Sequence, residues 1–281
     1  MAVGHFNISD IAGLKAIFGA ALRLASLAQG DTQIIIGVSE GEREFLGVKT
    51  VAAIIKSLRE EFDYPIFLNA DHTHSLEGIR QTVEAGFDSV IFDGSKFSFE
   101  ENIKQTKEAV QYVKSKNKKI LVEGELGYIG SSSQLLEAIP QGVDLSLNNL
   151  VSPEQAKEFV EKTGVDLFAP AVGNMHGMLK NAPEPDLNIG RIQEIHAAVK
   201  VPLVLHGGSG SRDEEFVNAI KAGISVIHIN TEIRKAWRQG IESALKSQSN
   251  EVAPYRILEP AVKEIQKIVE QRLKLFNSAL I

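Results

Sequence analysis

Short apolar runs alternate with longer amphipathic stretches along the whole chain. The apolar runs are near-continuous and rich in aliphatic and β-branched residues, which is typical of parallel strands buried on both faces. We expect strands at residues 2–7, 33–38, 65–70, 88–93, 119–125, 165–171, 201–206 and 224–230. The amphipathic stretches predict helices at about residues 10–28, 46–61, 75–86, 99–116, 153–162, 188–199, 212–222, from Thr231 onward and at about 257–278.

These elements form eight strand–helix units in 281 residues. That number predicts an α/β fold, a single (β/α)₈ TIM barrel with an additional C-terminal helix, over residues 1–281. A doubly wound sheet is the alternative, because a local pattern does not show whether a sheet closes. The segment 127–148 is long for a strand–helix connection, and such loops are usually functional or mobile.

The composition limits the binding partners and the metal ligands that can be expected. A net charge of −6 gives no support for binding to nucleic acid or to an anionic membrane surface. No apolar run approaches the roughly 20 residues of a membrane span, and the N-terminal residues do not resemble a signal peptide. The chain has no cysteine, so a metal must bind to His, Asp, Glu or backbone oxygens. A cytoplasmic location is expected and agrees with that composition.

Polar residues gather where the predicted strands end, which is the edge that carries the site in such barrels. They are Asn69, Asp71, His72, Glu123, Glu125, residues 173–177, residues 206–210, His228, Asn230 and Thr231. His72, His176 and His206 at one rim, with an open fourth position, would form a catalytic zinc arrangement. A single histidine at a strand end is more often structural, and these separations match no local zinc motif. His5, in a strand, and His196, in a helix, are assigned structural roles.

The segment HGGSGS at residues 206–211 is a candidate phosphate-binding loop. Glycines let backbone N–H groups approach an anion, and such barrels often bind phosphate after the seventh and eighth strands. By itself the segment is equally well explained as a tight turn. Lys180 could serve a second phosphate, although a solvated lysine is at least as common, and Arg234 and Lys235 are expected at the surface.

Longer motifs show a resemblance to a known family. They are AVGHFNIS, NADHTHSLEGIRQTVEAGFDSVIFDGSKFSFEENIKQTKEAV, VEGELGYIG, GNMHGMLK, VPLVLHGGSGS and INTEIRKA, in this order from about residue 2 to about residue 240. In content and order they resemble the class II, metal-dependent fructose-bisphosphate and tagatose-bisphosphate aldolases. The combination of the DGS-x-x-x-FEEN run, the Asp-His pair and the two His-Gly motifs is highly specific.

The resemblance implies a TIM barrel with a divalent metal, usually Zn²⁺. It implies that His72, His176 and His206 bind the metal, that Glu125 lies near it, and that Asp71 exchanges a proton with the C4 hydroxyl of the substrate. The residues implied to bind substrate or its phosphate are Ser39, Gly177, Lys180, Gly207, Gly208, Ser209, Asn230 and Thr231. A monovalent-cation site near Gly177 and Lys180 is also implied.

The chain departs from the family pattern at three places. Ser132 and Ser133 stand where the family usually has an acidic pair, so the proton on the nucleophilic carbon has no evident base, and Glu137 is a weak substitute. His228 replaces the asparagine that usually contacts the dihydroxyacetone part; it could donate to the same oxygens, take over the proton transfer or narrow the pocket. Lys96 follows the DGS motif where histidine is common, and could meet an anionic group.

Together the motifs predict a metal-dependent aldolase that reversibly cleaves a ketose bisphosphate, fructose 1,6-bisphosphate first, into dihydroxyacetone phosphate and an aldehyde phosphate. Asp71 and His228 are the predicted catalytic residues. The alternatives are tagatose 1,6-bisphosphate or another ketose phosphate as substrate, a metal-dependent isomerase or epimerase, and a barrel that binds a sugar phosphate without turnover. A homodimer or homotetramer is expected from the family, although the apolar stripe of residues 261–276 could equally cover the chain's own barrel.

Overall fold

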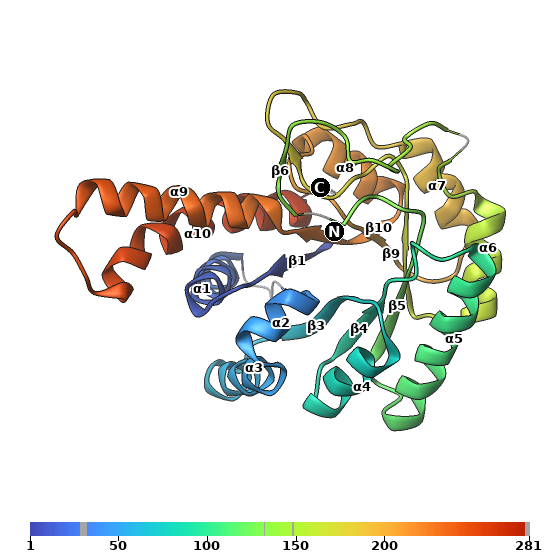
Figure 1. Cartoon of the computed structure of the whole chain (residues 1–281), viewed down its shortest axis with the longest axis horizontal. Coiled ribbons are helices and arrows are strands. Elements are labelled where there is room, and N and C mark those ends of the chain that lie inside the picture. Colours follow the sequence, from blue (N-terminus) through green and yellow to red (C-terminus); the bar gives the residue numbers. More distant parts are fainter. Residues whose placement is uncertain (29–32, 132, 148, 279–281) are drawn as a thin grey trace.

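The computed structural model describes residues 1–28, 33–131, 133–147 and 149–278, and its central feature is a closed barrel of parallel strands (Figure 1). Around the ring the strands are β1 (Val3–Asn7), β10 (Ile224–Ile229), β9 (Leu203–Leu205), β7 (Leu167–Pro170), β5 (Leu121–Leu126), β4 (Ser89–Phe92), β3 (Ile66–Thr73) and β2 (Ile34–Val38). The predicted TIM barrel is therefore confirmed. The alternative of an open, doubly wound sheet is wrong, because β1 pairs with both β2 and β10 and closes the ring.

Helices follow the barrel strands and cover the outside of the barrel (Figure 1). They are α1 (Ile11–Ala28), α2 (Glu40–Leu46), α3 (Val48–Phe62), α4 (Leu76–Ala85), α5 (Phe99–Lys116), α6 (Pro153–Thr163), α7 (Ile189–Ala198), α8 (Asp213–Ala222), α9 (Thr231–Ser247) and α10 (Pro254–Ser278). Among the described residues, none of these helices combines the length and apolar character that a membrane span requires.

The helix expected at about residues 46–61 is α3, and the helix that precedes it, α2, was not predicted. α2 and α3 are separated at Gly47, whose backbone φ of 85° favours glycine. α2 begins after Ser39 in a capping box with Glu42. Its hydrophobic pattern is weak because the residues that it buries include Glu42 and Arg43.

The long segment 127–148 contains a short strand that the sequence pattern did not predict. β6 (Leu135–Leu136) pairs in parallel with β8 (Met178–Leu179), which lies in the connection after β7. The backbone N–H of His176 also donates to the carbonyl of Ile129 at 2.8 Å. These bonds hold the segment beside the residues that follow β7, at the end of the barrel where the strands terminate.

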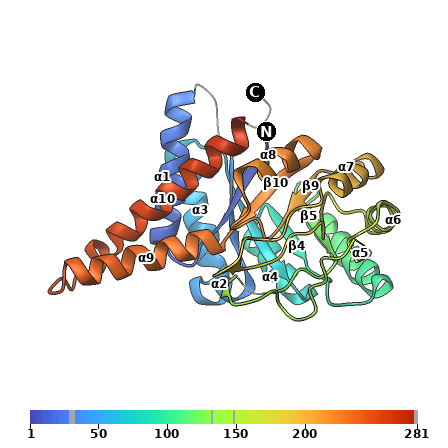
Figure 2. The same cartoon turned by 90° about the horizontal axis from the view of Figure 1, so that it is seen from above.

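The last two helices form an antiparallel pair that extends beyond the barrel (Figure 1, Figure 2). α10 begins at Pro254, three residues before the expected start near residue 257, and packs against α9 and α1. The inward side chains of its apolar stripe are Ala261, Ile265, Val269, Leu273 and Phe276, and all are buried within the chain. The stripe therefore covers the chain's own core.

The barrel interior has an apolar layer and a polar layer. Ala169, Val204 and Val226 form a small buried cluster inside the ring. Nearer the carboxyl ends of the strands, the interior contains buried polar side chains, among them His5, Asn69, Glu123 and His206. Since buried polar groups need partners, this layer is where a site is expected.

Candidate active site

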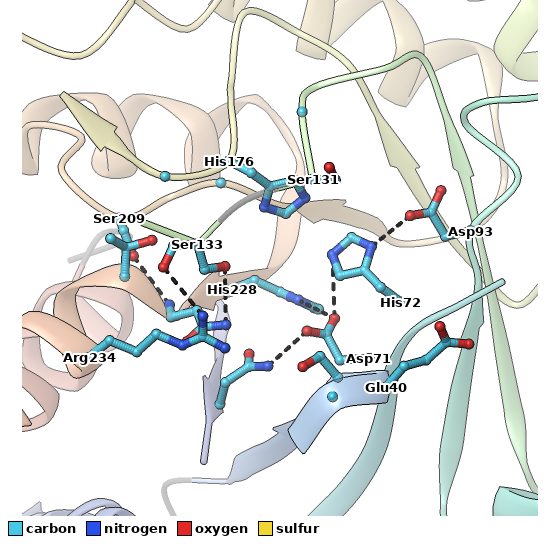
Figure 3. Close-up of a pocket in the computed structure, with 18 of the residues that line it drawn as sticks. Glu40, Asp71, His72, Asp93, Ser131, Ser133, His176, Ser209, His228 and Arg234 are labelled. Carbon is cyan, nitrogen blue, oxygen red and sulfur yellow. Dashed lines mark hydrogen bonds and ion pairs between the residues drawn. The ribbon is translucent and has the colours of Figure 1, made fainter. Parts of the chain in front are cut away.

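A cavity of about 290 Å³ opens at the carboxyl ends of the barrel strands (Figure 3). Ten of the residues proposed from the sequence line it: Ser39, Asp71, His72, His176, Gly177, Gly207, Ser209, His228, Asn230 and Thr231. The other described residues that line it are Asn7, Glu40, Gly41, His74, Asp93, Gly130, Ser131, Ser133 and Arg234.

The end of β3 directs two adjacent side chains into the same cavity. Successive side chains of a regular strand point to opposite faces, but the pairing of β3 with β4 shifts register between Ala70 and Thr73. His72 has a φ of 41°, an uncommon value for a residue with a side chain, and such backbone strain is typical of functional sites. The buried guanidinium of Arg43 supports this turn by donating to the carbonyls of Val38 and Asp71 at 2.5 and 3.0 Å.

His72, His176 and His206 face one another; His72 and His176 line the cavity, and His206 is buried beside it. One ring nitrogen from each lies within 4.8 Å of the others, and the Nδ1 atom of His206 is 3.2 Å from the Nε2 atom of His72. Burial and the nearby charge of His72 lower the pKa of His176 and His206, the latter to about 3. Both imidazoles are therefore neutral, which is the form that binds a metal.

The outer nitrogens of two of these histidines are oriented by carboxyl groups. The Nδ1 atom of His72 is 3.0 Å from Asp93, and the Nε2 atom of His206 is 2.6 Å from Glu123. Such carboxyl–imidazole pairs fix the ring orientation of metal ligands. The Nε2 atom of His176 is buried without a hydrogen-bond partner among the described residues. An unpaired, buried imidazole nitrogen facing two others fits a metal ligand.

Carboxyl groups around the three histidines favour positive charge at their centre. Burial disfavours a charged His72, but Asp71 and Glu125 outweigh it and raise the pKa of His72 well above its ordinary value. Glu125 lies 3.3 Å from the Nδ1 atom of His72, and its Oε2 atom is buried without a hydrogen bond. A divalent cation would take the place of that charge, so these residues fit a metal ion.

Asp71 is held as a carboxylate with one oxygen occupied. Its Oδ2 atom accepts a hydrogen bond from the amide of Asn7 at 2.8 Å. Its Oδ1 atom is 3.5 Å from the Nδ1 atom of His228 and has no hydrogen-bond partner among the described residues. Burial raises the pKa of Asp71, but the nearby imidazoles of His72 and His228 outweigh burial and hold it well below its usual range. An ionised carboxylate with a free oxygen can accept a proton.

The glycine-rich loop after β9 lies against the beginning of α9. Gly207 has a φ of 61° and lies so close to Met175 that a Cβ there would be 2.2 Å from the Met175 carbonyl oxygen. The hydroxyl of Ser209 accepts from the backbone N–H groups of Asn230 and Glu232 at 3.2 and 3.3 Å. Gly208, in the same loop, lies against the carbonyl of His228, where a Cβ would be 3.1 Å from the oxygen. Backbone N–H groups at a helix N-terminus suit an anion.

Arg234 is a cavity residue that the sequence assigned to the surface. It is the only lysine or arginine among the described residues that line the cavity. Its guanidinium donates to the carbonyl of Ser133 at 3.3 Å (Figure 3). It also donates to the buried Glu42 carboxylate at 2.7 Å. One cationic group therefore lies at the wall of the cavity, beside the glycine-rich loop.

Several residues proposed from the sequence lie elsewhere. Lys180 follows β8 and pairs with Glu137 at 2.5 Å, and neither residue lines the cavity. Lys96 is exposed and also lies outside the cavity. Ser132 is outside the described residues, whereas Ser133 accepts a hydrogen bond from the Asn230 amide at 3.2 Å. Within the described part of segment 127–148, no acidic side chain lines the cavity.

Two kinds of residue at this site were not predicted from the sequence. Asn7 is the last residue of β1 and Asp93 directly follows β4, so the rule that identified Asp71 would also have found them. Glu42, Arg43 and Arg234 lie on helices and reach the site only through the folded structure. Their helical positions carried no signal of that role.

The fold is a (β/α)₈ barrel, and its site is a histidine-rich centre whose residues could hold a metal ion. A family model described as fructose-bisphosphate aldolase class-II matches residues 1–280. The chain belongs to the class II fructose-bisphosphate aldolase family, whose members are lyases that cleave carbon–carbon bonds.

Individual relatives agree with this assignment. The chain is 34% identical to the fructose-bisphosphate aldolase of Geobacillus stearothermophilus, over 99% of this chain and 92% of the relative. It is 36% identical to the 6-phospho-5-dehydro-2-deoxy-D-gluconate aldolase of Shouchella clausii, over 99% and 90%. The crystal structure of the YdjI aldolase from Escherichia coli K12 matches with a TM-score of 0.79 and 31% identity, over 99% and 92% of the two chains.

Proposed function

We propose that this enzyme cleaves a ketose bisphosphate, with fructose 1,6-bisphosphate as the first candidate, into dihydroxyacetone phosphate and an aldehyde phosphate. The observation that carries the proposal is a grouping at one cavity: His72 and His176 in its wall face the buried His206, next to an ionised aspartate and two groups suited to phosphate. The relative named fructose-bisphosphate aldolase, 34% identical over 99% of this chain, supports the same substrate.

Asp71 is the proposed acid/base. Its free Oδ1 atom would accept the proton of the C4 hydroxyl while the C3–C4 bond breaks and the C4 oxygen becomes the aldehyde. The electron pair of the broken bond stays on C3 of the three-carbon fragment. C3 then gains a proton from solvent or through His228, and Asp71 returns its proton to solvent, so the protons balance. The amide of Asn7, by donating to Oδ2, keeps the other carboxylate oxygen directed toward the cavity.

His72, His176 and His206 would hold the metal, with Glu125 beside them. Zn²⁺ is the proposed ion, because three imidazoles without a thiolate suit it. When bound, the metal would stabilise, as a Lewis acid, the negative charge that develops on the substrate oxygens. The buried carboxyl groups of Asp93 and Glu123 would hold two of the imidazole rings in place.

The substrate would be anchored by the backbone around Gly207, Ser209 and Thr231 and by the guanidinium of Arg234. Anchoring a phosphate holds the reacting carbons near Asp71, which lowers the entropic cost of the reaction. We assign to His228 the contact with the three-carbon half, where its imidazole can donate to substrate oxygens or carry a proton. Ser39, which also lines the cavity, would contact the other end of the substrate.

A different ketose phosphate is the second candidate substrate. Two observations favour it. The relative named 6-phospho-5-dehydro-2-deoxy-D-gluconate aldolase is 36% identical over 99% of this chain. In addition, no acidic side chain from the described part of segment 127–148 lines the cavity. Tagatose 1,6-bisphosphate is a further alternative. A homo-oligomer, a cytoplasmic location and a monovalent cation near Gly177 remain predictions.

Triose-phosphate release from fructose 1,6-bisphosphate tests the proposal, measured with a coupled assay on zinc-loaded and EDTA-treated protein. Cleavage that EDTA abolishes and zinc restores is the expected result. If zinc-loaded protein releases no three-carbon product, the tagatose isomer and 6-phospho-5-dehydro-2-deoxy-D-gluconate are assayed next. Interconversion of substrates without fragments would contradict the aldolase proposal in favour of an isomerase, and saturable binding without turnover would favour a binding protein.

A further inference from the structure

Two buried histidines on neighbouring strands stack face to face beneath the cavity. His5 in β1 and His228 in β10 are directly paired in the register of the barrel. Their ring centroids are 3.4 Å apart and their planes differ by 4°. His228 lines the cavity, whereas His5 does not, so His5 lies behind the ring that would meet the substrate.

His228 is restrained on three sides. Its other face stacks on His206, with centroids 4.1 Å apart and planes that differ by 21°. Its Nδ1 edge lies 3.5 Å from the Oδ1 atom of Asp71. The ring is therefore held between two imidazoles and oriented by a carboxylate, so little rotation is open to it while His5 is present.

The ring of His5 is itself fixed by its surroundings. Its Nε2 atom is 3.1 Å from the Oδ1 atom of Asn69, whose amide donates in turn to the Ser89 hydroxyl at 2.7 Å. Since the Asn69 amide is used on Ser89, its oxygen faces His5, and the Nε2 atom of His5 carries the hydrogen. Gly37 provides the space, because a Cβ there would lie 2.1 Å from the Cε1 atom of His5.

The parallel stack argues against a second metal in this cluster. Ring nitrogens of His5 and His228 and an oxygen of Asp71 lie within 4.8 Å of one another. However, a ring nitrogen binds a metal in the plane of its ring, and two nearly parallel planes direct their lone pairs side by side rather than toward one point. Stacking is the interaction that this geometry favours.

We propose that His5 is a positioning residue that holds the His228 imidazole in the orientation needed for the aldol cleavage, a role that rests on the proposed function. His5 touches neither the cavity nor the three proposed ligands. It acts through one face of His228 and prevents that ring from turning away from Asp71 and the substrate. Loss of the stack should lower kcat, because a small displacement of a group beside the reacting atoms slows the reaction strongly.

The kinetic test compares His5→Ala, His5→Phe, His228→Asn and the double variant His5→Ala/His228→Asn. His5→Ala should lower kcat by about 10- to 100-fold with little change in KM, and His5→Phe, which keeps an aromatic face, should restore most of kcat. In the His228→Asn background, His5→Ala should change kcat less than about twofold, because substitutions at two residues that act through one another do not have additive effects. Equal losses in both backgrounds would overturn the proposal, and so would a fall in metal content in His5→Ala.

A second measurement does not depend on turnover. In spectra of ¹⁵N-histidine-labelled protein, the His228 ring, identified by its absence in His228→Asn, should show one tautomer in the native protein and in His5→Phe. It should show averaged signals in His5→Ala. Unchanged His228 signals in His5→Ala would refute the positioning role. If the native enzyme cleaves no ketose phosphate, the proposed function fails, and these spectra still decide whether His5 orients His228.

Discussion

Asn7 and Asp71 lie 64 positions apart in the sequence and are joined by a 2.8 Å hydrogen bond in the fold. The same Asn7 amide also donates to Glu42 at 2.9 Å, and Glu42 accepts from Arg234 at 2.7 Å. A continuous chain of contacts thus runs from the proposed acid/base to the only arginine of the described cavity wall. Placement of the carboxylate and of the guanidinium is therefore coupled through β1 and α2.

Asp71→Asn should retain the metal and lose most turnover. The amide is nearly isosteric but cannot accept the hydroxyl proton, so kcat is expected to fall by about 10²- to 10⁴-fold. Metal content is measured by elemental analysis and kcat by triose-phosphate release. Asp63→Asn is the matched control, because Asp63 is exposed and its left-handed conformation accepts asparagine. A kcat within threefold of the native value in Asp71→Asn would end the acid/base assignment.

His176→Ala and His206→Ala should each lower bound metal together with activity. Each variant removes one of three facing nitrogens, and a divalent ion held by two imidazoles binds much more weakly. The measurement is metal per chain after dialysis against a weak chelator. His196→Ala, on the exposed face of α7, should keep the native metal content. Full retention of metal in His206→Ala would remove that residue from the proposed ligands.

Arg234→Gln should weaken binding of phosphorylated substrate more than it slows turnover. Hydrogen bonds to charged groups contribute about 1.5–3 kcal/mol, which corresponds to a rise in KM of about 10- to 100-fold. Lys180→Gln serves as the control, because Lys180 pairs with Glu137 outside the cavity, and its KM should change by less than about threefold. An equal rise in KM for Lys180→Gln would mean that the bound enzyme brings this lysine to the phosphate.

The metal-free protein should become less stable as the pH rises from about 6.5 to about 8. Burial raises the pKa of Glu123 and Glu125 to about 8, whereas carboxyl groups of the unfolded chain have released their protons near pH 4.5. The folded state therefore holds more protons in this range, and stability falls with rising pH. The raised pKa of His72 acts with the same sign. The lowered pKa values of His5, His176, His206 and His228 act with the opposite sign, but only near pH 6.5, where unfolded imidazoles still hold protons.

Urea unfolding of EDTA-treated protein at both ends of this pH range measures the effect. Glu123→Gln should reduce the dependence on pH, because its side chain cannot release a proton. The exposed residue Glu100, in the first turn of α5, supplies the control Glu100→Gln, which should keep the native dependence. If Glu123→Gln and Glu100→Gln show the same dependence, the buried Glu123 carboxyl is not its source.

Gly240→Ala should destabilise the fold through the contact between α9 and α10. A Cβ at Gly240 would lie 2.3 Å from the backbone of Ala261, so the two helices would have to move apart. Overpacking of this kind costs about 1–3 kcal/mol or more. Gly190→Ala is the control, because Gly190 is exposed in the first turn of α7 and its nearest neighbour is a side-chain oxygen at 3.6 Å. Chemical denaturation of both variants should show a clear loss only for Gly240→Ala.

The sequence alone determined the eight strand–helix units and placed many of the candidate site residues at one rim. Strands buried on both faces have nearly continuous apolar runs, so the number of strands could be counted from the sequence. Parallel strands in a barrel bring their carboxyl ends to one rim. Asp71, His72, His206 and His228 all lie at or next to such ends, and His176 lies in the loop after β7. That is why these residues could be placed together without coordinates.

Only the tertiary structure decided which helical residues and which buried rings support the chemistry. Glu42 and Arg43 lie on a short helix without an apolar pattern, and Arg234 resembles any surface arginine until α9 is docked beside the cavity. The stack of His5 on His228 depends on the register between β1 and β10. Local periodicity records which face of an element is buried, whereas contacts between elements distant in sequence arise only when the barrel closes.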